Sequence, residues 1–188
     1  MQNITMPNPS KNILITGLPG SGKTTLIKKL VDQLREYNPA GFYTEEMRSR
    51  GTRTGFKLMS LDRKMSYTLA HVDIQGPHHI GKYGIDLPGF EQFLGTLSLL
   101  DLRPRLVIID EIGKMECLSP KFRDFVASLL KMPSPIIATI ALKAGGFIEE
   151  VKHRGDVHLY EVTERNRDIL LQGIDGLVRS LLASRDHK

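Results

Sequence analysis

The amino-acid sequence predicts an α/β fold with a parallel sheet and one inserted antiparallel hairpin. Three observations support this prediction. A short apolar run at 11–16 leads through a glycine-rich turn into a helical pattern. A second apolar run, Leu106–Ile109, is continuous and typical of a strand at the centre of a parallel sheet. Between the two, the segments 55–60 and 65–72 each alternate in character and are joined by 61–64, as in a β-hairpin.

The first part of the chain predicts a strand, a helix and a second strand. The first strand covers about 11–16, and a helix of about 22–37 follows it. This helix has apolar residues at helical spacing, which are Leu26, Ile27, Leu30, Val31 and Leu34. Asn38-Pro39 ends the helix. Residues 41–47 are predicted as a strand, and the charged segment 48–53 as a loop.

The second half of the chain continues the alternation of helices and strands. The segment 71–88 is rich in glycine, proline and histidine, and we expect little regular structure in it. Strands are expected over 105–110, 136–142 and 157–162. Helices are expected over about 89–101, from Ser119-Pro120 to Pro133, over 145–151, and in a last helix that carries Ile169, Leu170, Ile174, Leu177, Val178, Leu181 and Leu182.

Length and composition favour one domain over residues 1–188. The chain is 40% hydrophobic and 25% charged, which is ordinary for a protein that buries its own core. The formal net charge of +5 suits an anionic ligand. No run of lysine and arginine indicates a nucleic-acid tail, so nucleic acid is allowed as a partner but not indicated.

The sequence carries no sign of a membrane or secretory protein. Residues 1–10, expected to be a loose lead-in, lack the basic and apolar segments of a signal peptide. No stretch approaches the roughly 18 apolar residues that cross a bilayer. Cys117 is the only cysteine, which excludes an intramolecular disulfide and a cysteine-based zinc site. We expect a cytoplasmic protein with no membrane partner. A monomer is favoured, although the oligomeric state is not specified.

The most informative stretch is residues 17–24, which fits G-x-x-x-x-G-K-[ST], the phosphate-binding P-loop or Walker A motif. Glycines allow positive φ, so several N–H groups can converge on one point. The following helix N-terminus adds partial positive charge, which suits a nucleoside triphosphate. Lys23 is expected to reach the β- and γ-phosphates, and the Thr24 hydroxyl to bind Mg²⁺. The predicted nucleotide-binding residues are Gly17, Leu18, Pro19, Gly20, Ser21, Gly22, Lys23, Thr24 and Thr25.

A second half of the site is predicted at Asp110-Glu111, the Walker B position, at the end of the apolar run. Parallel sheets place ligands at the carboxyl ends of their strands, so we expect these acids on a strand beside the P-loop strand. Asp110 is the expected Mg²⁺ partner. Glu111, with Lys23, is the predicted catalytic residue, because it can orient or deprotonate water. An acid that activates water favours hydrolysis, and two solvated acids are the alternative.

Other side chains are weaker candidates for a role in the site. Thr139 is a candidate contact for the γ-phosphate or for water, but a β-branched residue that fills a strand is the favoured interpretation. His78-His79 is interpreted as part of a loop, and Cys117, without a nearby base, as structural. Arginines that are candidates to neutralise transition-state charge are Arg48, Arg50, Arg53, Arg154, Arg165 and Arg167.

The chain resembles the small P-loop nucleoside-triphosphatases of the THEP type. The resemblance runs from the P-loop nearly to the C-terminus. Its most distinctive part is Asp-Glu-Ile-Gly-Lys-Met-Glu at 110–116, because an acid pair alone is common among P-loop proteins. The other matching segments are Gly41–Arg48, Arg53–Phe56, Gly81–Tyr83 and Thr163–Arg167.

This resemblance implies the P-loop NTPase fold, a three-layer αβα sandwich with a mainly parallel sheet plus the antiparallel hairpin. It implies Mg²⁺-dependent hydrolysis of nucleoside 5′-triphosphates to diphosphate and phosphate, with broad selectivity that includes ATP and GTP. Under it, residues 17–24 bind phosphates, and Asp110 and Glu111 serve Mg²⁺ and water.

Four residues of the matched segments have no firm role, namely Lys114, Glu116, Asn166 and Arg167. Lys114 is expected either to add charge near the γ-phosphate or to pair with Glu46 or Glu116. Asn166 and Arg167 follow the last strand, where the loop of P-loop folds often borders the base. They are therefore candidates for base contact.

Two other function classes stay open. A small-molecule or nucleotide kinase would use the 73–87 loop and the 41–72 hairpin as an acceptor site. A nucleotide-dependent switch would bind RNA or a protein partner and use slow hydrolysis as a timer. Phosphate release without an added acceptor separates the first class from a triphosphatase, and stimulation by RNA would indicate the second.

Overall fold

The computed structural model describes residues 10–186, and the predicted lead-in lies outside them except for Ser10. The strands are β1 (Asn12–Thr16), β2 (Ala40–Ser49), β3 (Thr52–Ser60), β4 (Ser66–His71), β5 (His79–Ile80), β6 (Tyr83–Ile85), β7 (Val107–Ile112), β8 (Ile136–Ile140) and β9 (Val157–Glu161). The α-helices are α1 (Lys23–Gln33), α2 (Leu87–Leu97), α3 (Leu99–Leu102), α4 (Pro120–Lys131), α5 (Phe147–Lys152) and α6 (Arg167–Asp186). Two short 3₁₀ helices are η1 (Arg35–Tyr37) and η2 (Glu116–Leu118).

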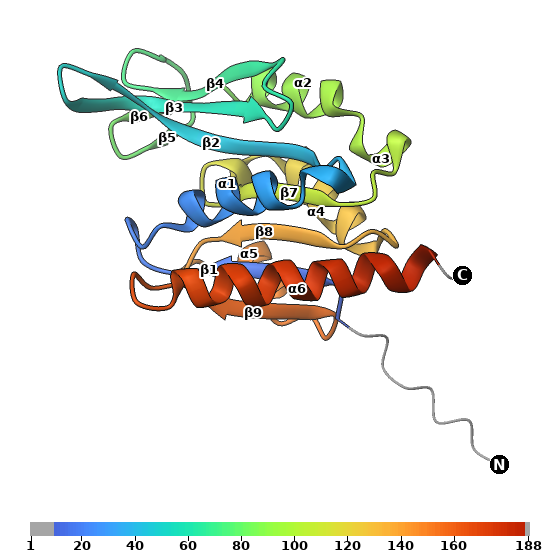
Figure 1. The fold of residues 1–188 in the computed structure, drawn as a ribbon. Coiled ribbons are helices and arrows are strands. Elements are labelled where there is room, and N and C mark those ends of the chain that lie inside the picture. Colours follow the sequence, from blue (N-terminus) through green and yellow to red (C-terminus); the bar gives the residue numbers. More distant parts are fainter. Residues whose placement is uncertain (1–9, 187–188) are drawn as a thin grey trace.

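Within residues 10–186, nine strands form one sheet in the order β5-β6-β4-β3-β2-β7-β8-β1-β9 (Figure 1). Strands β2, β7, β8, β1 and β9 pair in parallel. Strands β3, β4, β6 and β5 extend this sheet in antiparallel fashion from β2. The predicted mainly parallel sheet with an antiparallel addition is therefore confirmed.

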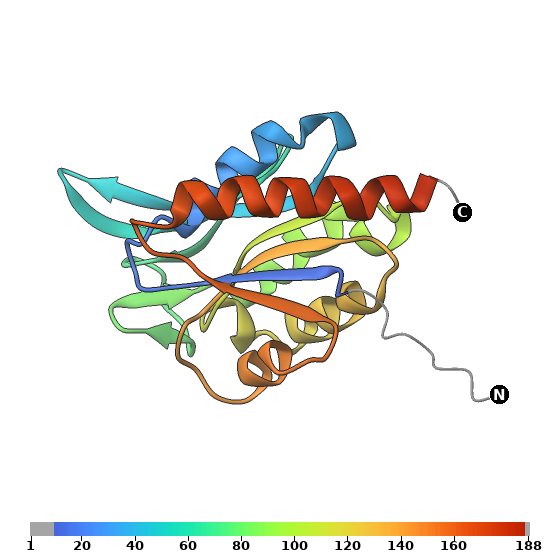
Figure 2. The same cartoon turned by 60° about the horizontal axis from the view of Figure 1, so that its bottom comes forward.

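Helices cover both faces of the sheet (Figure 2). Alternate residues of the strands point to opposite faces, as Ile13 and Leu14 do. Ile13 belongs to the apolar cluster formed with α1 and α6. Leu14 belongs to the cluster formed with α2, α3, α4 and α5. This arrangement is the predicted three-layer αβα sandwich. In the part of the chain that is described, no helix is long and apolar enough to span a membrane.

The first helix is shorter than the predicted 22–37. Helix α1 ends at Gln33, and the chain tightens into the 3₁₀ turn η1 before Asn38, whose φ of 49° is left-handed. Leu34 lies between the two helices and is nevertheless fully buried. The apolar pattern in the sequence therefore extends beyond the end of α1, because the chain at the start of the 3₁₀ turn still buries the Leu34 side chain.

The predicted loop at 48–53 is wrong, because these residues complete a β-hairpin. Strand β2 runs to Ser49 and β3 begins at Thr52. The turn residues Arg50 and Gly51 have φ of 48° and 80°, and two positive φ values match the sharp turns that join paired strands. Arg48 and Arg53 pair with Glu46 within the hairpin, so their charges do not break it.

Other parts of the chain also differ from the prediction. The segment 71–88 contains the small antiparallel pair β5 and β6, although it was expected to have little regular structure. The predicted helix 89–101 is two helices, because Ser98 is left-handed with φ of 47°. Helix α2 begins early, at Leu87, since the Asp86 side chain caps it by accepting from Gly89 N at 3.1 Å. In α6, Ile169 is 73% exposed and does not pack on the sheet.

Candidate active site

The P-loop connects β1 to α1 and is shaped by its glycines. Gly22 immediately precedes α1 with φ of 94°, and Gly20 has φ of 81°, values that L side chains rarely adopt. The Lys23 Nζ donates to the carbonyl oxygens of Gly17 at 3.1 Å and Leu18 at 3.3 Å. The lysine amine therefore lies over its own loop, close to the converging N–H groups at the helix start.

Asp110 lies on β7, and β8 separates β7 from the P-loop strand β1. The expectation that the acid strand is next to the P-loop strand is therefore wrong, although the two strands still end at the same edge of the sheet. The Asp110 side chain is only 1% exposed. Burial raises its pKa, against the hydrogen bonds from Thr139 and Thr24 and the charge of Lys23, which lower it.

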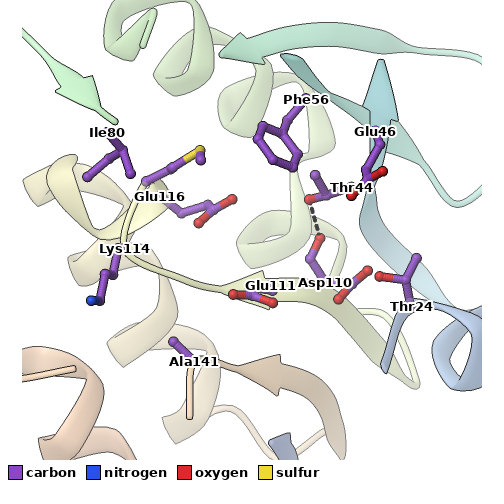
Figure 3. Close-up of a pocket in the computed structure, with 11 residues that line it drawn as sticks. Thr24, Thr44, Glu46, Phe56, Ile80, Asp110, Glu111, Lys114, Glu116 and Ala141 are labelled. Atoms are coloured by element: carbon purple, nitrogen blue, oxygen red, sulfur yellow. Dashed lines mark hydrogen bonds between the residues drawn. The ribbon is translucent and has the colours of Figure 1, made fainter. Parts of the chain in front are cut away.

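Thr139 on the intervening strand β8 binds one oxygen of the Asp110 carboxylate. Its hydroxyl donates to Asp110 Oδ1, and Thr139 is fully buried. The sequence favoured a residue that only fills the strand, but the structure gives it a polar contact with the acid. The other oxygen, Oδ2, accepts no hydrogen bond of standard geometry among the described residues. The Thr24 hydroxyl faces the Asp110 carboxylate in Figure 3.

Glu111 is half-buried and lies at the junction of two cavities. Burial is the main cause that raises its pKa, and the charge of Asp110 adds to it. The peptide bond between Asp110 and Glu111 is cis. A carboxylate with a raised pKa is a better proton acceptor than an ordinary glutamate, which suits the predicted role as a base.

The two cavities adjoin each other over the acid pair. The first, of about 590 Å³, lies at the P-loop and is lined by Gly20, Gly22, Lys23, Thr24, Thr25, Lys28, Thr44, Glu45, Glu46 and Glu111. The second, of about 370 Å³, is lined by Thr24, Thr44, Glu46, Phe56, Ile80, Asp110, Glu111, Lys114, Met115, Glu116 and Ala141 (Figure 3). Thr24, Thr44, Glu46 and Glu111 line both cavities. The structure thus brings Lys23, Thr24, Asp110 and Glu111 together, as the two motifs predicted.

The candidate arginines are separated by the fold. Arg48 and Arg53 both bind Glu46, at 2.6 and 2.7 Å, and Arg154 binds Asp156 at 2.7 Å. Arg50 and Arg165 are exposed. Of the set, Arg167 is the arginine with an observed contact to a P-loop residue.

Arg167 packs directly on Gly22. A Cβ placed on Gly22 would lie 2.7 Å from Arg167 Nη1. The buried Nε of this arginine has no hydrogen-bond partner within residues 10–186. Its neighbour Asn166 is engaged in the loop, since Nδ2 donates to Glu161 O at 2.9 Å and Oδ1 accepts from Thr163 N at 2.8 Å.

Lys114 does not form the predicted ion pair with Glu46 or Glu116. Among the residues described, it has no carboxylate within 4.0 Å, and Figure 3 shows its amine pointing away from the acids. Glu46 is held by two arginines instead. Burial raises the pKa of the Cys117 thiol to about 12, so the structural interpretation of this cysteine is consistent with a protonated, unreactive thiol.

Sequence reasoning missed the second cavity and gave Thr44, Phe56 and Glu116 no role there. These residues come from β2, β3 and the start of η2, and they meet through tertiary structure alone. The sequence contains one indication that these residues matter: each lies in a segment that matches the THEP type, at 41–48, 53–56 or 110–116.

Comparison with known proteins finds relatives over most of the chain. Residues 12–174 match the model of a protein family described as NTPase. The "Nucleoside-triphosphatase THEP1" of Thermotoga maritima is 45% identical over 163 residues, which cover 86% of this chain and 92% of that protein. The human "Cancer-related nucleoside-triphosphatase" is 37% identical over 187 residues, which cover 91% of this chain and 98% of that protein.

A solved structure shows the same fold. The crystal structure of THEP1 from Aquifex aeolicus superposes with a TM-score of 0.75 at 35% sequence identity, and the match covers 89% of this chain and 98% of that one. The family match, the identity over most of the chain and the shared fold confirm the resemblance seen in the sequence. This chain belongs to the NTPase family, together with the THEP1 proteins and the human cancer-related nucleoside-triphosphatase.

Proposed function

We propose that this protein hydrolyses nucleoside 5′-triphosphates to diphosphate and phosphate, with Mg²⁺, by attack of water on the γ-phosphorus. The observation that carries the proposal is the meeting of the P-loop residues Lys23 and Thr24 with Asp110 and Glu111 around two adjoining cavities. The names of the curated relatives support the triphosphatase activity. ATP, GTP and other triphosphates are included, because the P-loop addresses the phosphates that they share.

The residues present suit a magnesium ion. Mg²⁺ prefers hard oxygen ligands and takes one or two protein groups together with waters and substrate phosphates. Asp110 Oδ2 is a buried oxygen that accepts no hydrogen bond of standard geometry from the described residues, and the Thr24 hydroxyl faces the Asp110 carboxylate (Figure 3). These two groups would hold the ion. When bound, it would neutralise charge on the phosphates.

The remaining chemistry belongs to the protein. The loop N–H groups and the Lys23 amine would hold the phosphate oxygens and stabilise charge that develops on them. Glu111 would hold the attacking water and accept its proton, which the raised pKa of its carboxyl favours. Positioning and electrostatic stabilisation supply most of the catalysis in this kind of phosphoryl transfer.

The test is Glu111→Gln, which keeps the shape of the side chain and removes the base. We expect phosphate release to fall by roughly 100-fold or more, while binding of a fluorescent nucleotide changes little. Glu150→Gln on α5 is the matched control, because Glu150 is exposed and lines neither cavity. Unchanged turnover in Glu111→Gln would show that Glu111 is not the base.

The same assay addresses the two other function classes. A dedicated kinase would release little phosphate without an added acceptor. A nucleotide-dependent switch would show turnover that rises when RNA is added. The cytoplasmic location and the monomeric state remain predictions of the sequence.

A further inference from the structure

The second cavity is larger than an attacking water requires. It has a volume of about 370 Å³, whereas one water takes up about 30 Å³ of liquid volume. Its walls are partly apolar, with Phe56 from β3, Ile80 from β5 and Met115 from the turn after β7. Cavities of this size with a few polar groups are typical of sites for small organic molecules.

The cavity lies directly beside the reacting groups. It shares Thr24, Thr44, Glu46 and Glu111 with the P-loop cavity. Glu111 borders both spaces, so a hydroxyl group in the second cavity can reach the same carboxylate that we assign to water. A molecule bound there therefore competes with water for the attack on the γ-phosphorus.

Glu116 gives this cavity a buried polar group. It is only 5% exposed, and its carboxylate points into the cavity in Figure 3. Gly113 lets it approach Glu111: a Cβ on Gly113 would lie 2.7 Å from Glu116 Oε2 and 2.8 Å from Glu111 Oε1. Both oxygens lie within 2.8 Å of the same point, the Cβ position of Gly113. The two carboxylates are therefore close neighbours.

The charge state of Glu116 suits recognition of a neutral hydroxyl group. Burial raises the pKa of Glu116 to about 8, and the charge of Glu111 adds to the effect. A protonated carboxyl can both donate and accept a hydrogen bond. On the opposite wall, Glu46 is held in place by Arg48 and Arg53.

We propose that the second cavity binds a small alcohol with a partly apolar body and that the protein transfers the γ-phosphoryl group to its hydroxyl. This inference rests on the proposed function, because it uses the same nucleotide and the same base. The alcohol oxygen forms the new P–O bond as the bond between the γ-phosphorus and the bridging oxygen breaks. The nucleoside diphosphate leaves with that electron pair, and Glu111 takes the hydroxyl proton and releases it to solvent.

The experiment measures the partition of the phosphoryl group between water and alcohol. The full chain turns over Mg²⁺-ATP in the presence of methanol or 1,4-butanediol at equal concentration, and the phosphate ester and inorganic phosphate are quantified. Methanol is small enough to react from the position of the attacking water. Butanediol also requires the cavity, which would hold its carbon chain and its second hydroxyl. We expect the ratio of ester to phosphate to be at least about tenfold higher with butanediol, since even one methylene group in an apolar pocket is worth about tenfold.

Substitutions in the cavity test where the preference arises. Phe56→Trp should fill the cavity and reduce the butanediol ratio to that of methanol, and Glu116→Ala should reduce it by removing the partner of the second hydroxyl. Phe125→Trp on α4 is the matched control and should keep the preference, because Phe125 lines a different cavity, next to α3. The ratio does not depend on how much enzyme is active, so partial misfolding of one variant cannot imitate the effect.

Three results would overturn the inference. They are phosphate release without any butanediol ester, a butanediol ratio no higher than that of methanol, and a preference that survives both Phe56→Trp and Glu116→Ala. In each case hydrolysis itself persists, so the proposed function stands. If neither phosphate nor ester forms, the proposed function fails together with the inference.

Discussion

At the scale of single residues, Asp110 is held by threonines from the strands on either side of it, one at its carboxyl and one at its backbone oxygen. The Thr139 hydroxyl on β8 donates to Oδ1. The Thr44 hydroxyl on β2 donates to the backbone oxygen of Asp110 at 2.6 Å. Strands β2 and β8 both pair with β7, so the sheet itself supplies these contacts. Oδ2 is then the oxygen that we assign to the proposed Mg²⁺.

Thr139→Val tests this orientation, because valine keeps the shape and removes the hydroxyl. The buried Oδ1 of Asp110 would lose its donor, so its pKa would rise further and Mg²⁺ would bind more weakly. We also expect the free energy of unfolding to fall by about 1–3 kcal/mol. Turnover as a function of Mg²⁺ concentration and urea unfolding measure the two effects.

Thr139→Ser is the control, because serine retains the hydroxyl and should restore the Mg²⁺ dependence. If Thr139→Val has the same Mg²⁺ dependence as the unmodified protein, Thr139 only fills the strand, as the sequence favoured.

The buried Glu116 carboxyl makes stability depend on pH. Burial, with the charge of Glu111 second, raises its pKa from the ordinary value of 4.5 to about 8. Between these two values the unfolded chain loses the proton and the folded protein keeps it. The stability that the protonated group contributes therefore falls as the pH rises through this window. Glu116→Gln stays neutral in both states.

We expect the difference in unfolding free energy between Glu116→Gln and the unmodified protein to shift in favour of the variant as the pH rises. The slope should be at most about 1.4 kcal/mol per pH unit across the window. Urea unfolding of both proteins at a series of pH values measures it. Curves that stay parallel over this range would mean that the Glu116 carboxyl ionises normally in the folded protein.

The sequence allowed the phosphate-binding and acid residues to be predicted because each motif is local. The spacing of Gly17 to Thr24 encodes its own loop, and Asp110-Glu111 directly follows an apolar strand. Glu116 and Thr44 could not be placed in the same way. Their role depends on β2, β3 and the turn after β7 meeting in space, and no sequence spacing measures that distance.

At the scale of elements, the β2–β3 hairpin is where local sequence rules misled most. Charged residues at 48–53 indicate a loop when they are assumed to be solvated separately. In the structure, Glu46 accepts from both Arg48 and Arg53, and Arg53 also donates to the Tyr83 hydroxyl at 3.1 Å. The Arg48 pair lies along β2 and the Arg53 pair joins β3 to β2, so the charged residues are accommodated within the hairpin and do not interrupt it.

The contact between β2 and β7 depends on Gly41. Its φ is 140°, and a Cβ at this position would overlap the carbonyl oxygen of Ile108 on β7. Gly41→Ala must therefore push β2 away from the acid strand. We expect the unfolding free energy to fall by about 2–4 kcal/mol.

Gly95→Ala is the matched control, because Gly95 lies within α2 and a Cβ there meets nothing within 4 Å. Alanine in a helix should be neutral or stabilising by up to about 1 kcal/mol. Chemical unfolding of the two variants side by side gives the comparison. Equal effects would mean that the β2–β7 contact relaxes without cost.

At the scale of the whole molecule, the candidate site lies where the parallel part of the sheet meets the antiparallel part. The P-loop and Asp110 belong to the parallel part, on β1, α1 and β7. Phe56 belongs to the antiparallel part, and β2, which carries Thr44 and Glu46, pairs with both parts. A nucleotide in this position would contact groups from both, so its binding should stabilise the protein as a unit.

A non-hydrolysable triphosphate analogue with Mg²⁺ should therefore raise the melting temperature. At a concentration about 100 times its Kd, a ligand stabilises by about 2.7 kcal/mol. For a chain of this length that corresponds to roughly 5–10 °C. Chelation of Mg²⁺ should remove much of the shift, because Thr24 and Asp110 would bind the nucleotide through the ion. Glu111→Gln should keep the shift, since we assign Glu111 to water and not to binding. A shift of the same size with and without chelator would contradict the magnesium site, whereas the loss of the shift in Glu111→Gln would place Glu111 in binding.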